Sequence, residues 1–345
     1  MLPENLHKLF SPIAYRAGVY RRGWNTLAQQ RGLTAVLCYH RVIASDDRRK
    51  AGLTVDEGIT AATFEAQIRF MLRHFEPVEP ASAAQPGPSR RPRFAVTFDD
   101  GYGDNHDVAA PILLRLGVPA AFYVVSECVG STRRFWWDRL AAFVRDTGRT
   151  SLPLGGLLPD AASLPREMAL QGGDARRAAT DSLGAAFRQL DPTLIEPTLE
   201  RLRLRLDVED RPLAGDRLMD WSEVRGLAAQ GFEIGAHSAD HLNLACLDAA
   251  QLERQVAGAK QRIEAEIGRP VATFAYPYGG RSNFSAATMQ AVRSAGYRAA
   301  FTAIPGVVSG DQEATALPRL SLNWPLDFAC AHNVQAAIRA TARAG

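Results

Sequence analysis

The chain has 345 residues, of which 46% are hydrophobic and 22% are charged, and its formal net charge is +3. This length is enough for one large α/β domain or two smaller ones, and the composition is that of an ordinary soluble protein. So small a net charge gives no reason to expect nucleic acid as a partner.

The sequence lacks three features that would indicate a structural zinc cluster, a membrane span or secretion. The four cysteines lie far apart without C-x-x-C spacing, which argues against a structural zinc cluster. No apolar run reaches the length of about 18 residues that a transmembrane helix needs, so no membrane span is expected. Residues 1–30 lack the charged, apolar and small-residue layout of a secretion signal. We therefore expect the protein to be cytoplasmic or associated with a membrane surface.

Residues 1–32 are expected to form an N-terminal helical segment. Apolar side chains between Leu9 and Tyr20 stand among basic residues, as in an amphipathic helix. The apolar face of such a helix either packs against its own domain or lies on a membrane surface.

The first third of the chain predicts two strands with a helix between them. Thr34–His40 is apolar until it ends on a histidine, and Ala61–Phe75 has apolar residues at helical spacing. Arg93–Tyr102 begins as a strand and stops on two adjacent carboxylates, Asp99 and Asp100. At the mouth of a barrel or sheet both carboxylates can reach one cavity. The alternative is that the pair only ends a strand and solvates a turn.

The regular alternation of predicted strands and helices then stops. A helix over Asn105–Leu116 and a strand over Val118–Val125 are followed by polar, Ala- and Arg-rich sequence of helical character at Thr132–Leu218. We interpret this stretch as a helical insertion. Its aromatic cluster, Phe135–Trp137, offers a stacking surface to a sugar ring or pins the insertion onto the parent domain.

Alternation resumes with two helices that begin at capping boxes, at Asp220 and Asp248. Between them, Gly231–His241 contains a strand that ends on His237, with His241 four residues later. That spacing lets two imidazoles share a metal ion. The same spacing also occurs in polar surface pairs.

Three more strands are predicted, over Val271–Tyr276, Tyr297–Thr302 and Ala316–Asn323, with a helix over Phe284–Ala295 and another closing the chain. Strands that alternate with helices predict a parallel sheet. The polar residues that end these strands converge only if the sheet closes into a barrel, where active sites lie at the carboxyl ends of the strands.

Three stretches resemble motifs of the polysaccharide deacetylases of carbohydrate esterase family 4. They are Thr97–Tyr102, His237–His241 and Phe274–Gly279, and the third matches only in part. The resemblance covers roughly residues 33–323 and implies an irregular (β/α)7 barrel. We therefore assign residues 33–345 to the barrel, interrupted by the helical insertion at about 132–218.

The resemblance also implies a site. Two histidines and a carboxylate form the ligand set of an open catalytic metal site, here Asp100, His237 and His241 around a divalent metal, most often zinc. Asp99 is then the general base, because a metal-bound water needs a nearby carboxylate to accept its proton. The backbone N–H of Tyr278 is the implied oxyanion donor.

Two family features are missing from their usual places. The Leu-x-His motif that supplies the general acid near the C-terminus is absent, but Leu37–His40 resembles it, as in circularly permuted relatives. His40 is then the acid, unless it is a core histidine that donates to a backbone carbonyl. The arginine of the third motif is replaced by Ala275. Arg319 is the candidate substitute, whereas Arg281 is nearer in sequence but expected to face solvent.

The sequence therefore predicts a metal-dependent hydrolase that removes acetyl from an amino sugar in an oligo- or polysaccharide, free or lipid-linked. One alternative keeps the barrel and hydrolyses a small cyclic amide. Another is an inactive carbohydrate-binding protein, which an intact base beside the metal ligands disfavours.

Overall fold

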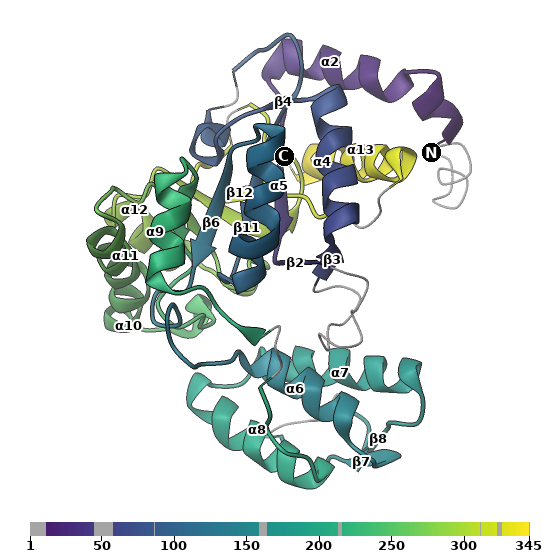
Figure 1. The fold of residues 1–345 in the computed structure, drawn as a ribbon, viewed down its shortest axis with the longest axis vertical. Helices are drawn as coiled ribbons and strands as arrows, with labels where there is room; N and C mark the ends of the chain where they lie inside the picture. Colours follow the sequence, from purple (N-terminus) through teal and green to yellow (C-terminus); the bar gives the residue numbers. More distant parts are fainter. Residues whose placement is uncertain are drawn as a thin grey trace. The chain divides into compact units, whose positions relative to one another are not determined.

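The computed structural model describes residues 12–44, 58–85, 87–158, 164–212, 216–310, 312–322 and 326–344 (Figure 1). The chain divides into two compact units. Unit 1 comprises Met1–Ser45, Gly58–Ser131 and Leu218–Gly345, and unit 2 comprises Asp46–Glu57 and Thr132–Arg217. Residues 1–11 of the expected N-terminal segment lie outside the described residues. That residues 132–218 are an insertion into the barrel stays our proposal.

A sheet of parallel strands forms the centre of unit 1. Its main path runs in the order β1 (Thr34–Tyr39), β5 (Arg93–Phe98), β6 (Ala120–Val124), β9 (Glu233–Ala236), β10 (Thr273–Ala275), β11 (Ala299–Pro305) and β12 (Leu317–Arg319). The first and last strands also meet, since Cys38 N donates to Leu320 O at 3.0 Å and Leu320 N donates to Val36 O at 2.8 Å. The seven-stranded barrel is therefore confirmed. A short β4 (Glu76–Pro77) pairs with β5 outside this path.

The strands form because their residues are apolar and suit burial on both faces, as in parallel sheets covered by helices. All six residues of β1 are buried. Alternate residues separate into two packed clusters, with Phe94, Val96 and Phe98 of β5 in one and Ala95 in the other. Side chains alternate along a strand, so Thr97 and Asp99 share the face of Ala95.

The predicted helices of unit 1 are present with small changes. They are α2 (Val19–Arg31), α4 (Ala61–His74), α5 (Ala110–Leu116), α9 (Trp221–Ala229), α10 (Ala249–Glu253), α11 (Ala259–Ile267), α12 (Ala286–Ser294) and α13 (Asp327–Ala344). Both predicted capping boxes are confirmed, at Asp220 and Asp248. Two π-helical segments, η2 (Asn105–Ala109) and η5 (Arg254–Gly258), interrupt helices that the sequence predicts as continuous.

Short elements complete unit 1. They are the parallel pair β2 (Arg41–Ile43) and β3 (Gly58–Thr60), and the 3₁₀ turns η1 (Pro80–Ala84) and η4 (Leu244–Cys246). None of the described helices combines the length and the apolar character needed to cross a bilayer.

Unit 2 has its own small core. It contains α6 (Trp136–Asp146), the antiparallel strands β7 (Ser151–Pro153) and β8 (Glu167–Ala169), α7 (Gly173–Phe187) and α8 (Pro192–Leu206). The indole of Trp136 stacks on Phe187, with ring centroids 5.4 Å apart. Part of the predicted aromatic cluster therefore packs inside the unit itself. The hairpin of β7 and β8 is absent from the sequence prediction, because three-residue strands carry too little periodicity to be recognised.

Candidate metal and catalytic site

The two acidic residues of the first motif sit where β5 ends. Asp99 continues the strand alternation, so its side chain shares the face of Ala95 and Thr97. Asp100 then adopts a left-handed backbone with φ 74°, and Gly101 follows with φ 80°. This turn reverses the alternation, so that adjacent carboxylates reach the same end of the barrel.

Strained backbone concentrates around the same end. Among the described residues, the non-glycine positions with positive φ are Asp100, Asp207, Ser238, His241 and Tyr278, and all but Asp207 belong to the three motifs. Such conformations cost of order 1–3 kcal/mol each and gather at functional sites. The sequence could not reveal them, because none of these positions is a glycine.

The predicted ligand trio comes together. Asp100 Oδ1 lies 3.4 Å from His237 Nε2 and 3.3 Å from His241 Nε2, and all three residues are buried. His237 Nδ1 donates to the carbonyl of Ala275 at 2.8 Å, because a carbonyl can only accept. The Nε2 lone pair of the neutral ring is then directed to the same space as the carboxylate, as in many metal-binding histidines.

The electrostatics of the trio suit a cation. Burial opposes a charge on Asp100, yet the two imidazoles hold the pKa of this carboxyl well below its ordinary range. Burial likewise opposes a charge on His237, but Asp99 and Asp100 raise its pKa above the ordinary value. For His241 burial prevails and lowers the pKa, which leaves a neutral ring available as a ligand. Asp100 Oδ1 is also buried without a hydrogen-bond partner among the described residues. These residues therefore fit a divalent metal.

Asp99 has a different environment from its neighbour. Arg319, at the end of β12, binds it through two parallel hydrogen bonds, Nη1–Oδ1 at 2.7 Å and Nη2–Oδ2 at 2.6 Å. The same guanidinium donates from Nε to Thr302 O at 2.8 Å. Burial opposes a charge on Asp99, but Arg319 outweighs it and lowers the pKa of the carboxyl. Arg319 thus stands beside the predicted base, whereas Arg281 is exposed.

The residues of this site lie partly within a stretch that is similar to a known protein family. A sequence model of the family described as polysaccharide deacetylase matches residues 189–300, a range that includes His237, His241 and Tyr278. The chain carries a polysaccharide deacetylase domain. The family expected from the motifs is therefore confirmed, while membership of the circularly permuted subgroup stays a prediction.

Individual relatives of this domain are distant. YxkH of Bacillus subtilis (strain 168), a protein assigned to the polysaccharide deacetylases, is 28% identical over 101 residues, which is 29% of this chain and 35% of that protein. The chain thus spans about a third of this curated relative.

Three solved structures share the fold of the deacetylase barrel. IcaB from Ammonifex degensii superposes with a TM-score of 0.53 at 18% identity, over 88% of this chain and 98% of that one. The Streptococcus pyogenes deacetylase PplD, in complex with acetate, superposes with a TM-score of 0.54 at 13% identity, over 86% of this chain and 94% of that one. The polysaccharide deacetylase BC0361 from Bacillus cereus superposes with a TM-score of 0.53 at 16% identity, and the match covers 84% of this chain and 65% of that chain.

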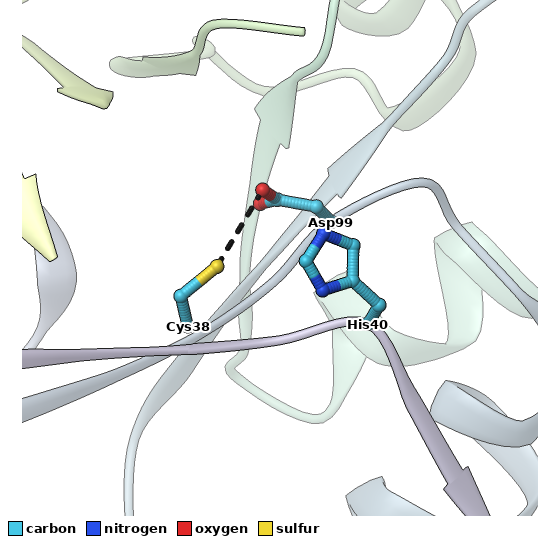
Figure 2. A group of neighbouring side chains, drawn as sticks. All are labelled: Cys38, His40 and Asp99. Carbon is cyan, nitrogen blue, oxygen red and sulfur yellow. Dashed lines mark hydrogen bonds between the residues drawn. The ribbon is translucent and has the colours of Figure 1, made fainter. Parts of the chain in front are cut away.

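His40 lies beside Asp99 in this deacetylase barrel, with Cys38 as a neighbour (Figure 2). One polar atom from each of these side chains lies within 4.8 Å of the other two. His40 is exposed, unlike a core histidine, and its carbonyl accepts from Asn105 Nδ2 at 2.8 Å. The thiol of Cys38 donates to Asp99 Oδ2 at 3.7 Å. No motif in the sequence singles out Cys38; the structure pairs it with Thr97, on the strand that leads to Asp99.

Tyr278 borders the ligand trio of the deacetylase domain. Its ring meets His241 edge to face, with centroids 4.7 Å apart, and its φ is 60°. The next residue, Gly279, has φ 59° and no space for a Cβ atom, which would overlap Ala303 N. The turn is therefore fixed in shape. The oxyanion role of the Tyr278 amide stays a proposal.

A buried glutamine that sequence reasoning missed supports the second motif of the deacetylase domain. Gln255 Oε1 accepts from Ala239 N at 3.1 Å and from Asp240 N at 2.9 Å. These amides lie between the two histidines, so Gln255 fixes the loop that brings both rings to Asp100. Gln255 lies in the π-helical segment η5, and no motif or periodicity singles it out.

Proposed function

We propose that this protein is a metal-dependent hydrolase that removes the acetyl group from an N-acetylated amino sugar in an oligo- or polysaccharide, releasing acetate. The observation that carries the proposal is that two adjacent carboxylates have different surroundings. Asp100 faces two imidazoles, whereas Asp99 is held by Arg319. The family match over residues 189–300 supports the same class of reaction.

Asp100, His237 and His241 are the proposed metal ligands, and zinc is the metal whose preferred donors they match best. When bound, a divalent metal lowers the pKa of water and polarises a carbonyl oxygen. The lowered pKa of Asp99 keeps this residue ionised, so it can accept the proton of the attacking water. Arg319 holds both carboxylate oxygens and fixes the direction of the remaining lone pairs.

The other residues act on the substrate in this scheme. The Tyr278 amide is the proposed donor to the oxygen of the amide carbonyl as negative charge develops on it. His40 is the proposed donor to the sugar nitrogen, which leaves as an amine once its bond to the acetyl carbon breaks. Its exposure suits this role, because the acid must meet a substrate that arrives from solvent. Water is consumed, and acetate and a free amine are formed.

The test is an acetate-release screen of the metal-loaded protein over N-acetylated glycans, free and lipid-linked. We expect acetate from at least one glycan, with loss of activity on chelation and recovery on adding zinc. Ammonia or a new carboxylate from small cyclic amides, without acetate from any glycan, would favour the cyclic-amide alternative. Glycan binding without turnover of either substrate class would favour the inactive binding protein.

A further inference from the structure

A cationic cavity lies on unit 1 at the start of α2, among residues that play no part in the proposed catalysis. It has a volume of about 240 Å³ and is lined by Tyr15, Arg16, Gly18, Arg21, Trp24 and His74. Hydrogen bonds fix its walls to two other helices, because the Tyr15 hydroxyl contacts both His74 of α4 and Asp327 of α13. Figure 1 shows α2, α4 and α13 together at this side of the barrel.

The charge of the cavity is positive. Arg16 and Arg21 have no ion-pair partner within the described part of the chain, and both are exposed. The nearby carboxylate of Asp327 forms an ion pair with Arg73 at 2.5 Å and accepts a hydrogen bond from the Tyr15 hydroxyl at 3.2 Å. Burial, followed by Arg73, lowers the pKa of His74, so this ring is neutral at pH 7 and the net charge comes from the two arginines.

The geometry of the backbone adds to this charge. Gly18 lines the cavity and is the N-cap of α2, with φ 69°, so the first backbone N–H groups of a 13-residue helix begin there. A helix N-terminus carries partial positive charge and attracts phosphate-type anions. Arginine binds phosphate through two parallel hydrogen bonds. A cavity of this size holds several times the volume of a water molecule, about 30 Å³, and accommodates one phosphate ester.

Exposed apolar side chains lie close in sequence to the cavity residues and to Asp327. Ile13 is 64% exposed and Val19 is 55% exposed; Ile13 precedes the cavity residues in sequence, and Val19 lies between Gly18 and Arg21. Leu326 is 54% exposed and Phe328 is 36% exposed, and they flank Asp327, which Tyr15 contacts. A basic site bordered by exposed apolar side chains suits the interface of a membrane, where phosphate groups lie next to acyl chains.

We propose that this cavity binds the phosphate of an anionic membrane phospholipid and holds unit 1 on a membrane surface, with Ile13, Val19, Leu326 and Phe328 inserted at the interface. A soluble phosphate ester would use the arginines but gain nothing from the apolar side chains. The proposal is independent of the proposed deacetylation.

The test measures partition of the metal-loaded full chain onto vesicles in 0.15 M salt. We expect binding to vesicles that contain phosphatidylglycerol and none to vesicles of phosphatidylcholine alone. The double variant Arg16→Ala/Arg21→Ala should weaken binding about thirty-fold, at roughly 1 kcal/mol per basic residue near the surface.

The matched control is Arg22→Ala/Arg31→Ala, which removes two charges from exposed arginines of the same helix that do not line the cavity. Arg31 lies about 15 Å along α2 from Arg21, beyond the Debye length of about 8 Å, so its loss should have little effect. Arg22 is next to Arg21, so the control variant should lose at most about fivefold in binding, at roughly 1 kcal/mol for one basic residue, against about thirty-fold for the cavity variant. Equal losses in the two double variants would overturn the cavity as the binding site. Unchanged far-ultraviolet circular dichroism and metal content would show that both variants are folded.

A second pair of measurements separates the lipid from a free anion. Ile13→Ser/Val19→Ser should weaken vesicle binding at least fivefold and leave the binding of glycerol 3-phosphate unchanged. Binding of glycerol 3-phosphate or inorganic phosphate without any binding to phosphatidylglycerol vesicles would overturn the membrane proposal.

Discussion

At the scale of single residues, the proposed chemistry depends on how two neighbouring aspartates differ. Asp99 and Asp100 are adjacent in sequence, but one is held by a guanidinium and the other faces two imidazoles. The sequence predicted both residues as site members from their place at a strand end. Their separate environments depend on Arg319, which lies 220 positions away, and the sequence offered both Arg319 and Arg281 as candidates.

The first prediction separates the two carboxylates. Asp99→Asn keeps the size of the side chain but cannot accept a proton, so acetate release should fall by about two to four orders of magnitude with metal still bound. Asp100→Asn should lose the metal, because a neutral amide replaces the charged ligand. Metal analysis of both purified variants, beside initial rates, is the measurement. Loss of metal from Asp99→Asn instead would make Asp99 a ligand and reverse the assignment.

The second prediction concerns the buried ion pair. Arg319→Lys keeps the charge but cannot form two parallel hydrogen bonds, so activity should fall about 10- to 100-fold with a folded, metal-containing protein. Arg319→Met leaves Asp99 as an unpaired buried charge and should destabilise the fold by about 3–5 kcal/mol. Urea unfolding of both variants tests this order. Equal stability of Arg319→Met and the wild type would show that Asp99 does not depend on the arginine for its charge.

The third prediction tests His40 as the general acid. His40→Ala should retain metal and fold, yet lose most activity on an N-acetyl amide, because an amine leaves only when protonated. On an activated acetate ester, whose leaving group departs without a proton, the loss should be much smaller. The comparison needs initial rates on both substrates with one enzyme preparation. Equal losses on amide and ester would return His40 to a structural role at the end of β1.

At the scale of elements, the strands were easier to predict than the details that shape the site. Apolar runs that end in polar residues located all seven barrel strands, and capping boxes located the starts of α9 and α10. The π-helical turn that carries Gln255 was missed, because an extra residue in a helical turn leaves the apolar spacing almost unchanged. The left-handed Ser238 and His241 were missed because tertiary contacts, not residue type, impose these conformations.

The fourth prediction concerns Glu233, the first residue of β9. Its carboxylate accepts from the Thr273 hydroxyl and from Ala81 N at 3.0 Å, but burial dominates and raises its pKa above the ordinary 4.5. The folded protein therefore binds this proton more tightly than the unfolded chain does. Stability from this group is complete below pH 4.5 and declines as the pH rises through the folded pKa.

Glu233→Gln removes this titration. Denaturant midpoints measured from pH 4 to pH 7 should fall less steeply with rising pH in the variant than in the wild type. Other groups titrate equally in the two proteins, so the difference between the two profiles isolates Glu233. Parallel profiles would show that the carboxylate is solvated well enough to keep its ordinary pKa.

At the scale of the whole molecule, barrel closure explains why the proposed catalytic residues come from both ends of the chain. β1 pairs with β5 on one side and meets β12 on the other, so His40, Asp99 and Arg319 lie at the carboxyl ends of three neighbouring strands. In an open sheet β1 and β12 would be opposite edges. The sequence predicted the closure only indirectly, from polar strand ends that had to converge, and it could not give the register that sets Arg319 against Asp99.

The fifth prediction uses the points where the chain leaves unit 1 and returns to it. Gly130 N donates to Met219 O at 2.9 Å, and Met219 N donates to Gly101 O at 2.9 Å. The two ends of residues 132–217 are thus close together and tied to the turn that follows Asp100. Because joining such ends needs only a short loop, replacing residues 132–217 by a short Gly/Ser linker should leave the barrel folded and able to bind one metal ion.

The measurements are the metal stoichiometry and the unfolding transition of the shortened protein, with the same deletion in an Asp100→Asn background as the metal-free control. We expect a single cooperative transition, because the barrel strands and their covering helices all lie in unit 1. Activity separates two roles for unit 2. Retained hydrolysis of an activated acetate ester with loss of glycan turnover would assign unit 2 to substrate binding, whereas a deletion protein that fails to fold or to bind metal would show that the barrel depends on unit 2 for its stability.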